Sequence, residues 1–241
     1  MRYTLEVIAY NIESCVIAQD NGADRIELCA NPGEGGTTPS YGMIKAAKQK
    51  CSIPIFVMIR PRGGDFFYSD EEFRIMQEDI IYCRDFGCDG VVLGILNADG
   101  TVDINRIKVL VQLAYPMEVT FHRAFDRVKD AHQSLEDVID CGCTRILTSG
   151  LRPTAMQGIS LIRELVELAD ERIIIMPGAG VRASNIEGLI ELSGAVEFHT
   201  SAGMRRDSRM EYKNVDMGEI LDWHVADGNE IVLIKNLLSN R

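Results

Sequence analysis

Short apolar runs recur along the chain, and several are continuous: IPIFVMI at residues 53–59, GVVLGIL at 90–96 and RIIIM at 172–176. Continuous apolar strands are typical of a parallel sheet that is covered on both faces. The pattern predicts eight strands, at residues 4–9, 24–28, 53–60, 90–95, 117–122, 145–148, 173–177 and 196–199. A doubly wound sheet is the alternative, but it usually has fewer strands.

Amphipathic helical stretches alternate with these strands. Glycine ends the helical stretch before four of the strands, as Gly22, Gly87, Gly142 and Gly194. Glycine takes the left-handed conformation at a helix C-terminus at low cost, so these positions predict the loops that lead into the next strand. Eight βα units of about 30 residues each predict an α/β fold, a (β/α)8 TIM-like barrel that forms a single domain over residues 1–241. A last helix is predicted near 228–239.

Composition and charge narrow the classes of function. Of the 241 residues, 46% are hydrophobic and 25% are charged, as in an ordinary soluble globular protein. The formal net charge of -11 argues against nucleic acid or an anionic membrane as a partner, because both require a basic surface. No apolar run is long enough to span a bilayer, and the first residues lack the pattern of a secretory signal.

The seven cysteines show no disulfide or zinc-finger spacing. None forms a CxxC motif, and the closest pair, Cys141 and Cys143, is expected at a helix end as structural thiols. A chain of this size needs no disulfides to stabilise its core, so reduced thiols and a cytoplasmic location are expected.

Polar and small residues follow almost every predicted strand, whereas the opposite strand ends carry plain turns. In a TIM-like barrel the site lies at the carboxyl ends of the strands, on the loops that lead into the helices. This asymmetry predicts a site in that position. The candidate residues are Glu27, Cys29, Arg60, Arg62, Asp65, His122, Arg123, Asp126, Ser149, Gly178, Gly180, His199, Ser201 and Gly203.

The stretch FVMIRPRGGDFFYSD at 56–70 ends a strand with two arginines on a glycine hinge. Arg60 and Arg62 are expected to clamp an anion, and Glu27 or His122 to move a proton. A carboxylate inside a barrel is costly unless it is paired. Glu27 therefore needs a partner, for which the two arginines and His122 are the candidates. A buried Glu27–Arg60 ion pair that only organises the barrel, and a hydrogen-bonded core histidine at 122, are the alternatives.

Asp126 is assigned to the same catalytic group, where it and Asp65 are expected to position the arginines. The loops PGAG and HTSAG after the last two strands are expected to hold a phosphate on their backbone amides. A G-x-G-x-x-A dinucleotide fingerprint also fits the first loop, but it follows a seventh strand and is weak alone. The predicted substrate-binding residues are Asp65, Arg123, Ser149, Gly178, Gly180, His199, Ser201 and Gly203.

Seven segments together resemble the CutC family of copper homeostasis proteins: ADRIELC, EGGTTPS, MIRPRGGDFFYSD, VTFHRAFD, RILTSG, MPGAGVRASN and EFHTSAG. The resemblance runs in order over most of the chain, from about residue 5 to about residue 215. The resemblance implies a cytosolic TIM-like barrel that forms a homodimer or a higher homo-oligomer, acts in the control of cellular copper and binds Cu(I).

The resemblance also implies a copper ligand. Family members proposed to bind Cu(I) carry one cysteine in the first strand beside the cysteine of the IELC motif. Here IELC supplies Cys29, but the first-strand position is Ile8. Because soft sulfur ligands suit Cu(I) and one thiol makes a poor site, Cys29 would need His122 or a methionine such as Met58.

Three functions are compatible with the sequence. The first is a copper homeostasis protein that binds Cu(I) through Cys29. The second is an enzyme that acts on a small anionic or phosphorylated metabolite, with a variant in which Glu27, His122 and His199 hold a divalent metal. The third is a non-catalytic ligand sensor that uses the same pocket. The residues do not select a reaction class.

Overall fold

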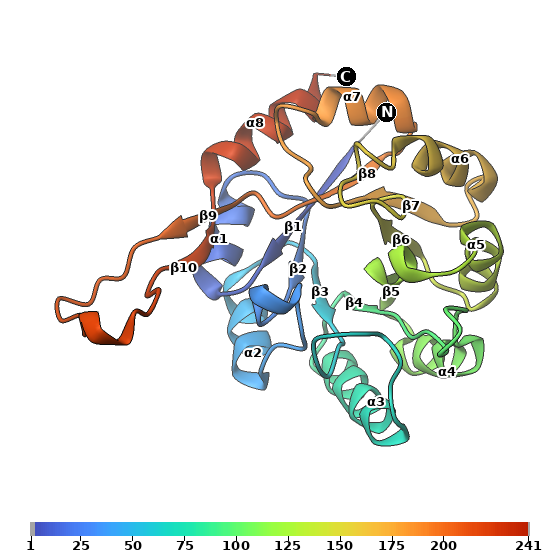
Figure 1. Cartoon of the computed structure of the whole chain (residues 1–241), viewed down its shortest axis with the longest axis horizontal. Helices are drawn as coiled ribbons and strands as arrows, with labels where there is room; N and C mark the ends of the chain where they lie inside the picture. Colours follow the sequence, from blue (N-terminus) through green and yellow to red (C-terminus); the bar gives the residue numbers. More distant parts are fainter. Residues whose placement is uncertain (1–2, 241) are drawn as a thin grey trace.

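A computed structural model describes residues 3–240, and a parallel eight-stranded barrel forms its centre (Figure 1). Each of the eight predicted strands is present, usually shorter by one to four residues than predicted. The barrel strands are β1 (Thr4–Ala9), β2 (Arg25–Leu28), β3 (Ile55–Met58), β4 (Gly90–Leu93), β5 (Glu118–Phe121), β6 (Arg145–Thr148), β7 (Ile174–Pro177) and β8 (Glu197–Thr200). The prediction of a TIM-like barrel is confirmed.

The helices form the outer ring of the barrel (Figure 1). They are α1 (Ile12–Asp20), α2 (Tyr41–Lys50), α3 (Asp70–Asp85), α4 (Ile104–Ala114), α5 (Ala131–Asp140), α6 (Ile159–Ala169), α7 (Ile186–Ser193) and α8 (Gly228–Ser239). Short 3-10 helices lie at η1 (Pro32–Glu34), η2 (Arg123–Arg127) and η3 (Val215–Met217). Within residues 3–240, no helix combines the length and the apolar character needed to cross a membrane.

Strand order and register decide which side chains meet inside the barrel. The sheet runs β7-β6-β5-β4-β3-β2-β1-β8, and β7 contacts β8 to close the circle without a hydrogen-bonded ladder. On β1, Ile8 is paired with Glu27 of β2, and Glu6 is paired with His199 of β8. Residues from both ends of the chain therefore share the barrel interior.

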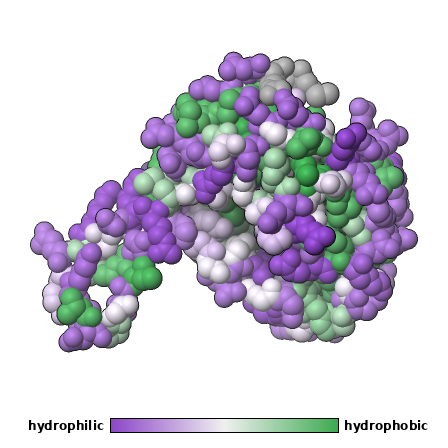
Figure 2. Space-filling model, turned by 45° about the horizontal axis from the view of Figure 1, so that its top comes forward, coloured by the Kyte–Doolittle hydropathy of each residue, from purple (hydrophilic) through white to green (hydrophobic). Residues whose placement is uncertain are grey.

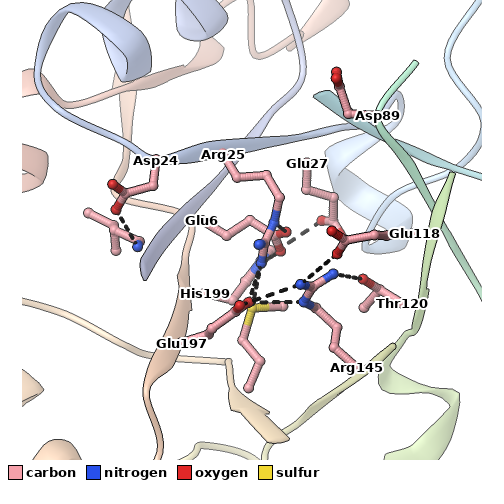
Figure 3. A network of polar contacts seen from close by, with 12 residues as sticks. Glu6, Asp24, Arg25, Glu27, Asp89, Glu118, Thr120, Arg145, Glu197 and His199 are labelled. Carbon is pink, nitrogen blue, oxygen red and sulfur yellow. Dashed lines mark hydrogen bonds and ion pairs between the residues drawn. The ribbon is translucent and has the colours of Figure 1, made fainter. Parts of the chain in front are cut away.

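The strands are buried on both sides, as their continuous apolar pattern predicts. The main hydrophobic core fills the layer between strands and helices and includes Leu5, Ile26, Phe121 and Phe198. A smaller apolar cluster lies inside the barrel and consists of Ile8, Cys29, Phe56, Met58 and Val92. Charged side chains share this interior, and Figure 3 shows several of them in contact.

One element lies outside the predicted pattern. The antiparallel strands β9 (Gly203–Arg206) and β10 (Trp223–Ala226) connect β8 to α8, and the segment between them extends away from the barrel (Figure 1). We call residues 203–226 the arm. Its tip carries apolar patches among polar residues (Figure 2). The large exposed apolar residues of the arm are Met204, Met210, Tyr212, Val215, Met217 and Ile220.

Candidate functional site

A cavity of about 200 Å³ lies at the carboxyl ends of the barrel strands, and we call it the mouth cavity. Its walls come from β1, β2, β3, β6 and β8 and from the loops that follow β1, β2, β3, β5, β7 and β8. Half of the residues predicted for the site line it. These residues are Glu27, Arg60, His122, Arg123, Gly180, His199 and Ser201.

Glu27 does not take its partner from Arg60, Arg62 or His122, contrary to the sequence-based expectation. Its Oε2 lies 3.9 Å from Nε2 of His199 and accepts a hydrogen bond of 3.5 Å from the Cys29 thiol. Its Oε1 is buried and has no hydrogen-bond partner. The reason is the register, because β1 lies between β2 and β8 and both neighbours direct side chains into the same interior.

Glu27 and His199 are electrostatically coupled. Burial raises the pKa of Glu27 to about 7, against the lowering effect of His199 and with a further increase from Glu6. Burial lowers the pKa of His199, but Glu27 and Glu6 outweigh it and raise that pKa above its usual range. The charge of each group therefore affects the proton affinity of the other.

Glu6 orients His199 from below the mouth cavity (Figure 3). Its Oε1 lies 2.7 Å from Nδ1 of His199, and its Oε2 accepts a 2.6 Å hydrogen bond from Nε of Arg25. Burial would raise the pKa of Glu6, but Arg25 and His199 lower it to about 2, so the carboxylate is charged. An anchored Nδ1–H leaves Nε2 of His199 facing Glu27.

A chain of ion pairs continues from Arg25 toward the other end of the barrel (Figure 3). Arg25 also donates to Glu197, which accepts a second hydrogen bond, of 2.9 Å, from Nε of Arg145. Arg145 is further paired with Glu118 at 2.9 Å. Each of the buried charges in this chain has a partner of opposite sign, which offsets the cost of removing it from water.

Ligand atoms of Glu6, Glu27 and His199 all lie within 4.8 Å of one another, a separation that would suit a metal ion. The divalent-metal variant assigned His122 rather than Glu6 to this group. His122 is not part of this cluster.

His122 is a neutral hydrogen-bond donor at the cavity wall. Its Nδ1 accepts a 3.1 Å hydrogen bond from the backbone N–H of Ala124 at the start of η2, so the proton of the neutral ring lies on Nε2. Burial lowers the pKa of His122 to about 3, and Arg60 adds to this shift. Nε2 is buried and has no partner among the described residues.

Arg60 is held by the backbone rather than by a carboxylate. Its guanidinium donates to the carbonyl oxygens of Glu34, Gly36 and Gly64 at 2.6 to 2.9 Å. The predicted Glu27–Arg60 ion pair is therefore absent. Nε of Arg60 is buried and has no hydrogen-bond partner among the described residues. Arg60 lines the mouth cavity.

Arg123 is the partly exposed cation of the mouth cavity, and Asp126 holds it in place. Nε of Arg123 donates to Asp126 at 2.7 Å and Nη2 donates to Oγ of Ser149 at 2.9 Å. Its side chain is 39% exposed. Asp126 is buried and also accepts from Thr148 and from Ser149, so this carboxylate positions Arg123 and has no room for a substrate.

Arg62 and Asp65 lie away from the mouth cavity. Arg62 donates to Glu72, in the capping box of α3, at 2.6 Å and to Asp65 at 2.9 Å. The side chain of Asp65 is 71% exposed. The structure therefore does not bring Arg62 together with Glu27, Arg60 and His122, because the chain bends from Pro61 onward and Glu72 and Asp65 hold the Arg62 side chain.

The last two loops bring part of the predicted phosphate site to the cavity. Gly180, with φ of +78°, and Ser201 line the mouth cavity, whereas Gly203 lines a neighbouring cavity beside the arm. A Cβ on Gly178 would meet Leu147 at 2.5 Å, so Gly178 provides room for packing. It does not line the cavity wall.

Cys29 lies under the mouth cavity beside Met58. A Cβ placed on Gly36 would lie 3.2 Å from Sγ of Cys29 and 3.5 Å from Cε of Met58, so the two sulfur side chains share one small space. Burial, together with Glu27, raises the pKa of the Cys29 thiol well above its usual range. Ile8 belongs to the same apolar cluster, where the resemblance implies a second cysteine.

Three residues of the site were missed by the sequence analysis. Tyr10 and Phe66 line the mouth cavity, and Glu6 orients His199. For Glu6 a signal exists, since strand alternation places it on the same side of β1 as Ile8. Tyr10 follows β1 directly, but Phe66 lies in the loop after β3 and no periodicity marks it.

Five buried side-chain polar atoms within residues 3–240 lack a hydrogen-bond partner, and three of them belong to residues that line the mouth cavity. These three atoms are Oε1 of Glu27, Nε of Arg60 and Nε2 of His122. Buried polar groups are normally satisfied, so their concentration in one cavity indicates groups that await a ligand. The arrangement offers two donors, a proton-exchanging carboxyl group and a cation.

The model of the CutC family matches residues 3–204. The chain is 51% identical over 214 residues to family protein CutC of Chromobacterium violaceum, which covers 89% of this chain and 87% of that protein. It is 48% identical over 221 residues to the human copper homeostasis protein cutC homolog. This match covers 91% of this chain and 81% of the human protein. The solved structure of the copper homeostasis protein CutC from Streptococcus agalactiae is similar at 38% identity and a TM-score of 0.78, covering 83% of this chain and 98% of that one.

Proposed function

The chain belongs to the CutC family, and from this membership we propose that it is a copper homeostasis protein whose mouth cavity binds a small anionic ligand and transfers a proton on it. The cellular role is supported by relatives, since the human and mouse proteins are named copper homeostasis protein cutC homolog. The molecular role is supported by the residues of the cavity.

One observation carries the molecular proposal: three residues that line the mouth cavity, Glu27, Arg60 and His122, each carry a buried polar atom without a hydrogen-bond partner. Leaving a buried polar group without a hydrogen bond costs on the order of 1–3 kcal/mol each. A protein that only needed a stable barrel would gain nothing from three such groups in one place. A ligand with matching acceptors and donors would satisfy all of them.

Arg123 supplies the charge that attracts an anion. Asp126 and Ser149 hold its guanidinium through Nε and Nη2, which leaves Nη1 for a ligand. Gly180 and Ser201 line the opposite loops, where backbone N–H groups can share a phosphate or carboxylate. Anion binding at a preorganised arginine requires little reorganisation.

Glu27 and His199 supply the proton. A buried glutamate with a pKa of about 7 has the proton affinity expected of a general acid or base that works at neutral pH. Glu6 holds the imidazole in one orientation, with Nε2 at 3.9 Å from Oε2 of Glu27.

The test is calorimetric titration of the purified protein with inorganic phosphate. We expect binding that weakens at least tenfold in Arg123→Ala and stays unchanged in Arg62→Ala, because Arg62 pairs outward with Glu72 and Asp65. Equal affinity in the wild type and Arg123→Ala would refute an anion site at the mouth cavity.

Direct binding of Cu(I) is a second candidate, favoured by the proximity of Cys29 and Met58 beside Gly36. A thiol and a thioether are soft ligands that suit Cu(I). The raised pKa of Cys29 opposes metal binding, since the thiolate is the ligand and a proton must leave first. Titration with Cu(I) against a chromogenic competitor should show tighter binding by the wild type than by Cys29→Ala.

Self-association and a cytoplasmic location complete the proposal. The arm places exposed Met210, Tyr212, Val215 and Ile220 away from the barrel, which supports a homodimer or a higher homo-oligomer. All seven cysteines are free, which fits a reducing compartment. Light scattering of the wild type and of an arm variant with these residues changed to serine tests the assembly.

A further inference from the structure

Two residues that line the mouth cavity each carry an unpartnered N–H donor whose role the surrounding structure fixes. Nδ1 of His122 is occupied as an acceptor, so the neutral ring can only donate from Nε2. A guanidinium has no acceptor, so the unpartnered Nε of Arg60 is also a donor. Neither atom can accept a hydrogen bond from a ligand.

The two donors are held beside the same ring. The centroid of Phe66 lies 4.8 Å from the ring centroid of His122 and 4.9 Å from Cζ of Arg60. Three backbone carbonyls immobilise the guanidinium, and η2 immobilises the imidazole. Rigid N–H donors that reach the same ligand oxygen would stabilise negative charge on it.

Glu27 and Arg123 complete the set. Glu27, which has an unpartnered oxygen, lines the same cavity, and the 39% exposed side chain of Arg123 there is available to an anionic group. A ligand that satisfies all four groups carries an oxygen acceptor, an acidic C–H or O–H and a phosphate or carboxylate.

We propose that the ligand is a small carbonyl compound with a phosphate or carboxylate group, and that the protein removes the proton from the carbon next to its carbonyl. This inference rests on the anion-binding function proposed above and specifies its substrate class. Arg60 Nε–H and His122 Nε2–H bind the carbonyl oxygen, Arg123 binds the anionic group, and Glu27 is the base.

The proposed step is balanced within these groups. The carboxylate of Glu27 takes the proton from carbon, the C–H electron pair forms a carbon–carbon double bond, and the carbonyl π electrons move onto the oxygen. The resulting enolate is stabilised by the two N–H donors. Return of the proton from Glu27 to carbon restores the carbonyl, so no oxidant, reductant or second reactant is needed.

Phosphoglycolate tests the recognition, because its planar carboxylate resembles an enolate and its phosphate matches inorganic phosphate. We expect the wild type to bind phosphoglycolate at least tenfold more tightly than inorganic phosphate in calorimetric titrations. His122→Leu should lose this preference and keep its affinity for inorganic phosphate, whereas His122→Gln, which retains an N–H donor, should keep most of the preference.

A measurement on the wild type avoids any folding defect of these variants. In protein labelled with ¹⁵N-histidine, phosphoglycolate should shift the Nε2–H resonance of His122, and inorganic phosphate should not. A resonance that phosphoglycolate leaves unchanged, or equal affinities for the two anions, overturns the inference. Loss of both affinities in Arg123→Ala would still support the anion site, so the two proposals fail separately.

Solvent exchange tests the proton step. With glycolaldehyde phosphate in deuterium oxide, we expect the wild type to exchange the hydrogen on the carbon next to the aldehyde faster than buffer alone, as followed by proton NMR. Glu27→Gln should exchange it at the buffer rate. Equal rates in the two proteins would overturn the role of Glu27 as the base.

Discussion

His199 Nδ1 and Glu6 Oε1 lie 2.7 Å apart, although the two residues are separated by 193 positions in the sequence. The contact exists because β8 pairs with β1 and places these residues opposite each other. It fixes the orientation of the imidazole that faces Glu27, so the geometry of the site depends on the pairing of the first and last barrel strands.

Removal of the Glu6 charge should destabilise the protein strongly. In Glu6→Gln, buried Arg25 and His199 lose their charged partner, and breaking a buried pair costs on the order of 3–5 kcal/mol. Glu118→Gln is the matched control, because that carboxylate pairs with Arg145 but is 52% exposed, and its cost should stay below about 1 kcal/mol. Urea unfolding measures both changes, and similar losses in the two variants would contradict the assignment.

His122 should make folding sensitive to acid. Its pKa is about 3 in the folded protein and 6.5 as a reference, so the unfolded chain binds the extra proton first as the pH falls. The free energy of unfolding should therefore decrease from about pH 6.5 downward, by about 3 kcal/mol between pH 7 and pH 4 from this residue alone.

His122→Gln isolates that contribution. Glutamine does not titrate, so the variant should lose less stability than the wild type over the same pH range, as measured by urea unfolding at each pH. Parallel pH profiles for the two proteins would show that His122 is not kept neutral by burial.

Asp126→Asn should affect both stability and anion binding. The buried carboxylate accepts hydrogen bonds from Thr148, Ser149 and Arg123, and its loss should cost on the order of 2–4 kcal/mol. Phosphate affinity should fall as well, since Arg123 loses its anchor. Asp65→Asn, at an exposed pair with Arg62, should change the unfolding free energy by less than about 0.5 kcal/mol and leave phosphate binding intact.

Ile8→Cys should strengthen Cu(I) binding. Ile8 is paired with Glu27 in the ladder and belongs to the buried cluster with Cys29 and Met58, so a second thiol would join the sulfur ligands there. Competition titration should show at least a tenfold gain over the wild type, and this gain should disappear when Cys29→Ala is added. An unchanged affinity would place any copper site elsewhere.

The barrel could be predicted because its signals are local. Each buried strand is a short apolar run, and glycines such as Gly87 and Gly142 mark the turns that precede the next strand, so the fold class and all eight strands were recognised. The arm was not predicted because its apolar residues are interspersed among polar ones without a regular period. Its strands pair only with each other, and no pattern of core residues predicts them.

The site could be predicted as a location but not as a set of contacts. Glu27, Arg60, His122, Arg123 and His199 were expected at the carboxyl ends of strands and line the cavity there. The partner expected for Glu27 was wrong, because its actual neighbour, His199, is brought to it by the register of strands that are distant in the sequence. Arg62 stands two residues from Arg60 but turns outward to Glu72.

Periodicity and turn chemistry within short windows are enough to specify the alternation of strands and helices, and with it the end of the barrel at which a site could form. The folded chain alone reveals that Glu27 meets His199, that Asp126 anchors Arg123, and that two donors remain unpaired. These contacts join residues from separate strands, and their geometry follows from strand register and barrel closure, which no local pattern encodes.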